Sequence, residues 1–464
     1  MKNISLKEIK KAASASLIRG DLNKNIKEIK IDSREIESGD LFIAIIGENQ
    51  DGHIFLKSAV ENGAAAVIVS REVELPEDVS ILKVNDTTRS LQDIAGYYRR
   101  KYKDLKVIAI TGSAGKTTTK DMISAVLSEK FSTLKTEGNY NNHIGLPLTL
   151  LKLNGSEDFA VLEMGMSGFG EIKLLSEIAL PDAGIITNVG AAHLEQLGSL
   201  ENIAKAKKEL VDSLDESAAA FLNYDNKFCR KMGSDFEGRI IYFGFEKGAD
   251  LRVRDYKFNK NQLRQDFKLE YKNKFYDFYI KKPGKHNIYN ALSAVGVGFE
   301  YNMEAEDIQK GLLEAEFTAL RMETIRLDNQ RVLINDCYNA NPLSVRAAVD
   351  VLSDFPGKRK IAVLASMLEL GKESKAAHKN IGNYIYEKNI DILLTVGKKA
   401  EMIAAGAEDS GMNSKKIFSF NSNNEAAEFL MSESREKDII LIKGSRANEM
   451  EKISEKLISK GSSN

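Results

Sequence analysis

The chain has 464 residues, of which 43% are hydrophobic and 29% are charged, and its formal net charge is −1. This composition is ordinary for a globular protein, and the balanced charge argues against a protein that binds mainly nucleic acid. At roughly 150 residues per domain, the length predicts about three domains. The start lacks the apolar core of a signal peptide, and no run of about 18 apolar residues occurs, so we expect a cytoplasmic protein without membrane insertion.

Residues 1–100 contain short apolar runs that predict a small α/β domain. Residues 41–46 and 66–69 have the composition of buried strands, and residues 54–61 between them have apolar side chains at helical spacing. A turn-rich segment at 47–53 interrupts the region.

Residues 101–315 alternate between apolar strand runs and helical segments. The runs at 107–110, 159–162 and 184–187 predict parallel strands joined by crossover helices. Near 250–281 the alternation of apolar and polar residues instead predicts antiparallel strands.

Residues 316–464 repeat the strand–helix alternation. The expected strands are residues 332–336, 361–365, 392–396, 417–420 and 439–442. Strands alternating with helices of about ten or more residues predict a doubly wound, Rossmann-like sheet. The sequence therefore predicts an α/β protein.

The strand at 107–110 leads into a glycine-rich phosphate loop, Thr-Gly-Ser-Ala-Gly-Lys-Thr-Thr. Glycines let backbone N–H groups turn toward phosphate oxygens, and the helix that follows offers its positive end to the same anion. The strict pattern requires glycine at position 110, where this chain has Ile110. We expect a nucleoside triphosphate, with Lys116 on its phosphates and Thr117 on Mg²⁺. The residues expected to bind the nucleotide here are Thr111, Gly112, Ser113, Ala114, Gly115, Lys116, Thr117 and Thr118.

Polar residues follow the next strands of this region. Glu163 ends the run at 159–162, and His193 comes soon after the run at 184–187. Ligands gather at the carboxyl ends of strands in open α/β sheets, so we expect Glu163 to hold Mg²⁺ and His193 to be functional. An Asn/Gly-rich loop at 136–147 is either a plain loop or part of the site. Lysines 205, 207 and 208 alone predict a solvated helix face.

Taken together, these segments resemble the ATP-dependent Mur ligases. The similarity lies in residues 111–119, 138–147, 163–165 and 188–195, and residues 32–34, 39–42 and 51–53 resemble the uridine-nucleotide domain of the family. Residues 336–342, Asp-Cys-Tyr-Asn-Ala-Asn-Pro, resemble the signature of members that use D-alanyl-D-alanine. The resemblance implies three domains: a UDP-sugar domain at 1–100, a central ATP-binding domain at 101–315 and a Rossmann-like ligase domain at 316–464.

The resemblance also implies roles for particular residues. Lys116, His193 and Lys207 would be catalytic, with Lys207 carrying a CO₂-derived carbamate, and two Mg²⁺ ions would be bound. The implied metal ligands are Thr117, Glu163, His193 and Lys207. Further implied ATP contacts are Asn287, Arg321, Asp336 and Asn339. The implied substrate contacts are Ser33, Arg34, Asn139, Asn142, Asn341 and Arg446.

The implied activity is ligation of D-alanyl-D-alanine to a UDP-N-acetylmuramoyl tripeptide through an acyl phosphate, by a monomer that uses ATP. The alternatives are the relative that adds the third amino acid, a folylpolyglutamate-type ligase, and an ATP-binding protein that ligates nothing. The third residue of the tripeptide, diaminopimelate or lysine, stays open. Residues 365–366 are Ala-Ser where relatives commonly have Gly-Asp, and the role of that position also stays open.

Overall fold

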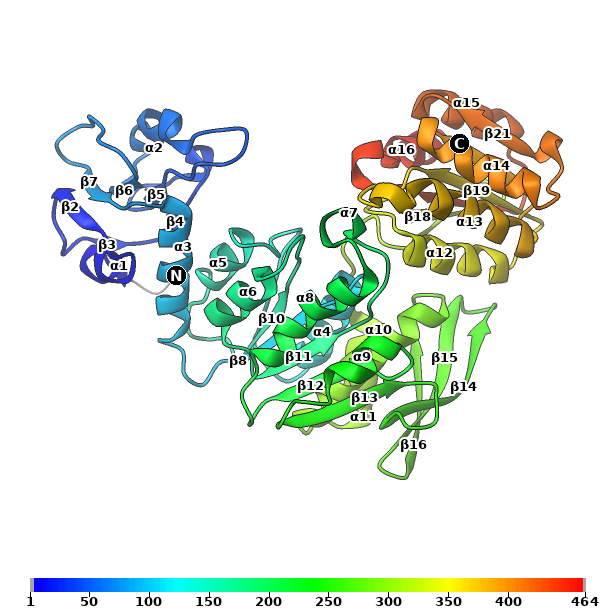
Figure 1. Cartoon of the computed structure of the whole chain (residues 1–464), viewed down its shortest axis with the longest axis horizontal. Helices are drawn as coiled ribbons and strands as arrows, with labels where there is room; N and C mark the ends of the chain where they lie inside the picture. The colour runs from blue at the N-terminus through cyan, green and yellow to red at the C-terminus, as the bar shows by residue number, and fades with distance from the viewer. Residues whose placement is uncertain (1–3, 462–464) are drawn as a thin grey trace. The chain divides into compact units, whose positions relative to one another are not determined.

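The computed structural model describes residues 4–461 and contains three larger β-sheets with helices packed on them (Figure 1). The chain divides into two compact units. The first comprises Met1–Thr111, Lys130–Gly184 and Glu209–Ala219, and the second comprises Gly112–Glu129, Ile185–Lys208 and Ala220–Asn464. The prediction of an α/β protein is confirmed. Within the described part, no helix is both long and apolar enough to cross a membrane.

The N-terminal part of the first unit is a five-stranded sheet. Its strands, in sheet order, are β2 (Ser16–Arg19), β7 (Ser80–Lys83), β6 (Ala66–Val69), β5 (Leu41–Ile43) and β4 (Ile29–Lys30). Strand β2 is antiparallel to β7, and the other neighbours are parallel. A two-stranded sheet of β1 (Ile4–Ser5) and β3 (Asn25–Ile26) and helices α1 (Leu6–Ala12), α2 (Leu56–Glu61) and α3 (Thr87–Arg99) complete this part.

Two expected boundaries in this part were wrong. The strand expected at 41–46 ends at Ile43, and a short bridge between Ile46 and Asp51 follows it. The helix expected at 54–61 begins at Leu56, because a 3₁₀ turn at Gly52–Phe55 precedes it. Asp51 starts that turn by accepting a hydrogen bond from the His53 backbone N–H, a local side-chain effect that apolar spacing does not reveal.

A nine-stranded sheet forms the middle of the chain. Its strands, in sheet order, are β16 (Lys274–Ile280), β15 (Arg264–Tyr271), β14 (Leu251–Asn259), β13 (Arg239–Gly244), β12 (Ala219–Asn223), β11 (Ala183–Ile186), β8 (Lys106–Thr111), β10 (Phe159–Glu163) and β9 (Thr133–Lys135). Strand β10 is parallel to β8 and β9, whereas β15 is antiparallel to both its neighbours, as predicted for 250–281. The helices are α4 (Lys116–Ser128), α5 (Gly145–Leu150), α6 (Glu171–Ala179), α7 (Leu194–Leu197), α8 (Leu200–Asp212), α9 (Lys227–Met232), α10 (Lys285–Glu300) and α11 (Ala305–Glu314).

A six-stranded sheet forms the C-terminal part of the second unit. Its strands, in sheet order, are β17 (Glu323–Arg326), β18 (Val332–Asp336), β22 (Asp438–Lys443), β19 (Arg359–Ala365), β20 (Ile392–Val396) and β21 (Ile417–Phe420). All of these strands except β17 are parallel to one another, and they lie close to the predicted ranges. The sequence did not reveal β17, an antiparallel edge strand that is largely exposed and lacks a buried apolar run.

Helices cover both faces of this last sheet, as a doubly wound fold requires (Figure 1). The helices are α12 (Pro342–Asp354), α13 (Ser374–Glu387), α14 (Glu401–Asp409), α15 (Asn423–Glu433) and α16 (Glu451–Gly461). One apolar core joins the sheet to α12, α13 and α14, and a second joins it to α15 and α16. The strands of each larger sheet all lie within one predicted domain range. The exact domain boundaries at residues 100 and 315 stay predictions.

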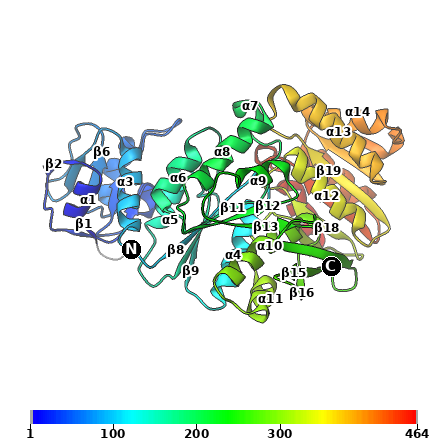
Figure 2. The same cartoon turned by 60° about the horizontal axis from the view of Figure 1, so that its bottom comes forward.

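Helices α13 and α14 lie side by side and touch through their backbones (Figure 2). A Cβ atom on Gly382 would lie 2.0 Å from the carbonyl oxygen of Ile403, and one on Gly406 would lie 2.1 Å from that of Lys379. The two glycines therefore permit a helix contact that no larger residue allows.

Substitution Gly382→Ala should destabilise the protein, because the added methyl group forces two helix backbones apart. We expect the free energy of unfolding to fall by about 1–3 kcal/mol, measured by urea denaturation followed by circular dichroism. The control Asn380→Ala, at an exposed position on the same helix, should stay within about 0.5 kcal/mol of the parent. Equal stability of the two variants would contradict the close contact.

Candidate functional site

The phosphate loop joins β8 to α4 through two glycines at positive φ. Gly112 has φ 152° and Gly115 has φ 85°. A Cβ on Gly112 would lie 1.9 Å from Oγ1 of Thr187, and a Cβ on Gly115 would lie 2.5 Å from Oδ1 of Asn290. Both conformation and space therefore require glycine here, and Gly112 provides part of the turn although position 110 is isoleucine.

Asn188 holds the loop from the neighbouring strand end. Its Nδ2 donates to the carbonyl oxygen of Ala114 at 2.9 Å, and its Oδ1 accepts from the Ala114 backbone N–H at 3.0 Å. The Ser113 hydroxyl also donates to the Gly190 carbonyl at 2.9 Å. The backbone around Ala114 is thus fixed before any phosphate arrives. The expected site included the segment 188–195 but did not single out Asn188.

A cavity of about 340 Å³ opens beside the loop in the second unit. Eleven of the residues predicted from the sequence line it: Ser113, Ala114, Gly115, Lys116, Thr117, Thr118, Asn287, Arg321, Asp336, Asn339 and Asn341. Asn188, His286, Asn290 and Lys443 also line the cavity, although sequence reasoning did not single them out. Burial lowers the pKa of His286 to about 4, so this imidazole is neutral at pH 7.

The far wall of the cavity carries Arg321, which reaches the phosphate loop. Its Nη2 donates to Oγ1 of Thr117 at 3.1 Å, and its guanidinium lies 3.8 Å from the ring centre of Tyr338. Asn341 caps helix α12, and its Nδ2 donates to the Ser113 carbonyl at 3.2 Å. Segments more than 200 residues apart in sequence therefore meet at the loop.

Asp336 and Lys443 form a buried ion pair in the same wall. Asp336 Oδ2 lies 2.6 Å from Lys443 Nζ, and Asp336 Oδ1 accepts from the Met322 backbone N–H at 3.1 Å. Both carboxylate oxygens thus already have protein donors. Arg446, expected near the substrate, is largely exposed and pairs with Glu451 at 2.6 Å, and it lines neither this cavity nor the one described below.

Glu163 ends strand β10 in the first unit, in register with Ile110 of β8. Its side chain is buried; Oε1 accepts from Asn141 Nδ2 at 2.8 Å, and Oε2 is buried with no hydrogen-bond partner among the described residues. A buried carboxylate oxygen without a donor is costly, and a cation would satisfy it. Asn141 belongs to the predicted polar loop, although we had expected Asn139 and Asn142 to act there.

His193 and Lys207 lie in the second unit. His193 has φ 58° at the start of α7, and its Nδ1 lies 2.7 Å from Oε2 of Glu369. This contact lowers the pKa of Glu369 below its usual value. Burial, with the nearby charge of Lys116, lowers the pKa of Lys207 well below its usual value. Within residues 4–461, no group of three or more His, Cys, Asp or Glu side chains could hold a metal ion.

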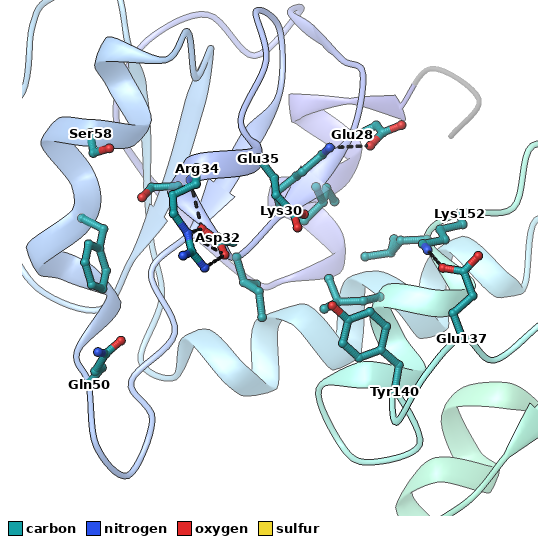
Figure 3. A pocket seen from close by; sticks show the side chains of 16 residues that line it. Glu28, Lys30, Asp32, Arg34, Glu35, Gln50, Ser58, Glu137, Tyr140 and Lys152 are labelled. Carbon is teal, nitrogen blue, oxygen red and sulfur yellow. Dashed lines mark hydrogen bonds and ion pairs between the residues drawn. The ribbon is translucent and has the colours of Figure 1, made fainter. Parts of the chain in front are cut away.

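A second cavity, of about 1270 Å³, lies in the first unit. Ser33 and Arg34, which we expect to contact the substrate, line it together with Tyr140 and Lys152. Figure 3 labels Arg34, Tyr140 and Lys152 around this cavity. Arg34 pairs with Asp32 at 2.5 Å, and this contact lowers the pKa of Asp32 to about 2.

Asn139 and Asn142 do not line this second cavity. Asn142 Oδ1 instead accepts from the backbone N–H groups of Ile144 and Gly145, at 3.1 and 2.8 Å, at the start of α5. The described contacts of Asn142 are therefore local.

Comparisons with known proteins agree with this arrangement. The Mur ligase family, catalytic domain matches residues 25–99, the Mur ligase middle domain matches 110–298, and the Mur ligase, glutamate ligase domain matches 320–446. The chain is 38% identical over 435 residues to the UDP-N-acetylmuramoyl-tripeptide--D-alanyl-D-alanine ligase of Bacillus subtilis, and the match covers 93% of each chain. The chain belongs to the Mur ligase family.

Solved structures of Mur ligases resemble this one along nearly its whole length. MurF from Acinetobacter baumannii matches with a TM-score of 0.91 and 32% identity, covering 99% of each chain. The MurF ligase from Thermotoga maritima in complex with ADP matches with a TM-score of 0.84 and 28% identity, covering 94% of this chain and 98% of that one. This Mur ligase therefore has the three-domain α/β architecture that the sequence predicts.

Replacing Asn188 by alanine should weaken nucleotide binding to this Mur ligase, because the Ala114 N–H loses its side-chain acceptor and the Ala114 carbonyl keeps only the hydroxyl of Thr187 as a side-chain donor. At about 0.5–1.5 kcal/mol for each hydrogen bond, we expect the affinity for ADP to fall roughly tenfold to a hundredfold, measured by isothermal titration calorimetry. Asn154→Ala, at an exposed turn of the first unit, is the control and should bind as the parent does. An unchanged affinity of Asn188→Ala would show that the loop holds its shape alone.

Proposed function

We propose that this Mur ligase joins D-alanyl-D-alanine to a UDP-N-acetylmuramoyl tripeptide, forming a C–N bond and releasing ADP and phosphate, in peptidoglycan precursor synthesis. The carrying observation is the 38% identity over 93% of the chain to the Bacillus subtilis ligase, whose name states this activity. The ADP complex of the Thermotoga maritima relative supports ATP as the second substrate. The alternative of a protein that binds ATP without ligation explains none of this full-length similarity.

The cavity in the second unit fits the triphosphate of ATP. The N-terminus of α4 lines this cavity and offers its positive end to an anion, and Lys116 and Arg321 add positive charge beside it. The reaction needs this charge, because the carboxylate of the tripeptide must approach the γ-phosphate. The carboxylate oxygen attacks phosphorus, ADP leaves, and the resulting acyl phosphate is attacked by the dipeptide amine with loss of phosphate.

We propose that Glu163, Thr117, His193 and Lys207 hold two Mg²⁺ ions. The unpartnered oxygen of Glu163 supports a cation at the end of β10. When bound, Mg²⁺ would neutralise phosphate charge and align the reacting oxygens. The ligand preferences of Mg²⁺ are oxygen atoms, which suits a carboxylate and a threonine hydroxyl.

Lys207 is the residue that we propose to carry a carbamate. Burial favours its neutral amine, which is the form that attacks CO₂ and then loses a proton. The carbamate converts the lysine into an anionic oxygen ligand. Lys205, two residues earlier on α8, is exposed and lacks this environment, which supports Lys207 as the modified residue.

The remaining assignments follow from the same function. We propose that the large cavity of the first unit, with Ser33 and Arg34, takes the uridine nucleotide. Asn287, Asp336 and Asn339 would contact ATP. Further proposed substrate contacts are Asn139, Asn142, Asn341 and Arg446. We also propose that the enzyme acts in the cytoplasm as a monomer on small-molecule substrates, without nucleic acid.

Phosphate release should require both a UDP-N-acetylmuramoyl tripeptide and D-alanyl-D-alanine. We expect turnover with ATP and both substrates, and at least a hundredfold lower rate when either is left out, measured by a coupled phosphate assay. Parallel reactions with the diaminopimelate and lysine tripeptides would identify the third residue. Release with glutamate and a folate, or with a free amino acid and a dipeptide nucleotide, would contradict the proposal.

Lys207→Ala should lower kcat at least a hundredfold, because neither a carbamate nor its charge can form. Lys205→Ala is the matched control on the same helix and should keep the parent rate. The parent enzyme should also lose activity in CO₂-depleted buffer and recover it on addition of bicarbonate, measured by the same phosphate assay. A fully active Lys207→Ala enzyme without bicarbonate would refute the carbamate.

A further inference from the structure

The segment that carries Arg321 has an unfavourable backbone conformation. Leu320 has φ 61° and Met322 has φ 49°, so two residues with large side chains flank Arg321 in the left-handed region. Residues other than glycine keep a left-handed backbone conformation only where neighbouring groups hold them in it. The arginine that reaches the phosphate loop is therefore presented by a segment that would relax without outside support.

Contacts from three other elements hold this segment. Asp121 of α4 accepts from the backbone N–H of Thr318 at 2.9 Å, and Asp336 of β18 accepts from the backbone N–H of Met322 at 3.1 Å. Lys282, just after β16, donates from Nζ to the carbonyl oxygen of Arg321 itself. Lys282 thus acts on the main chain of the residue whose side chain contacts Thr117.

The surroundings of Lys282 are unusual for a lysine. The residue is 6% exposed, and its Nζ lies 4.3 Å from the ring centre of Phe317. Burial lowers its pKa to about 8. Burying an ammonium group is costly, so an apolar side chain of similar length would be favoured if this position served packing alone. The carbonyl of Arg321, the face of Phe317 and the nearby negative charges of Asp336, Asp121 and Glu323 offset the cost.

We propose that Lys282 is a positioning residue for the nucleotide site, which holds the backbone of Arg321 so that its guanidinium stays on Thr117. The proposal rests on the proposed function for its catalytic consequence, whereas its effect on nucleotide binding does not depend on ligase activity. Lys282 lies three residues before α10, the helix that carries Asn287, so it also joins the start of that helix to the Arg321 segment.

The test combines Lys282→Met with Arg321→Ala. Methionine keeps the length and apolar body of the side chain but cannot donate to the carbonyl. We expect Lys282→Met to lower kcat/KM for ATP about tenfold and the affinity for ADP about fivefold, and Lys282→Arg, which keeps a donor, to recover most of both. In the Arg321→Ala background, Lys282→Met should change either quantity less than twofold, because the guanidinium that Lys282 positions is already absent.

Lys281→Met is the matched control, since Lys281 is the exposed neighbour, and it should behave as the parent. Equal losses from Lys282→Met with and without Arg321 would overturn the proposal, because a purely structural role adds to the loss from Arg321→Ala. If Lys282→Met does not fold, as judged by its thermal midpoint, Lys282→Ala, which also lacks a donor, is measured in both backgrounds, and equal losses in the two backgrounds would again overturn the proposal. Absence of ligase turnover in the parent would refute the proposed function, whereas the calorimetric comparison with ADP would still decide the role of Lys282.

Discussion

The close approach of backbone at the end of β8 is the constraint on which the nucleotide cavity depends. Gly112 and Gly115 leave no room for a Cβ beside Thr187 and Asn290. Only because the chain passes so near can the side-chain amide of Asn188 hold both backbone groups of Ala114. Protein contacts therefore fix the shape of the loop, so that binding an anion does not require the energy of reorganisation that a flexible loop would require.

Charge in the cavity follows from what surrounds this loop. Lys116 and Arg321 are placed beside the loop, whereas Lys443 is neutralised by Asp336 within the wall. The cations beside the loop are thus distinct from the cation that is paired within the wall. Lys207 represents the opposite case, since complete burial and the charge of Lys116 disfavour its ammonium form. Such a group is available for chemistry that a solvated lysine at pH 7 does not undergo.

Several parts of the site were accessible from the sequence because they are local patterns. The phosphate loop combines a strand, two glycines and a helix within about ten residues, and each feature has a direct physical meaning. Glu163 was found because it ends an apolar run, and the structure places it in register with Ile110. Arg446 was implied only by the family resemblance; its side chain forms a surface ion pair with Glu451, whereas Lys443 lines the cavity.

The sequence by itself determined the α/β class, most strand positions, the phosphate loop and the resemblance to the Mur ligases, because these depend on spacing along the chain. Only the tertiary structure decided that Asn188, Asn290 and Lys443 line the cavity, and that the amide of Asn141 meets Glu163. It also decided that Lys207, rather than Lys205, is buried. These properties arise from contacts between segments far apart in sequence, and burial or the direction of a side chain is set by its neighbours in space.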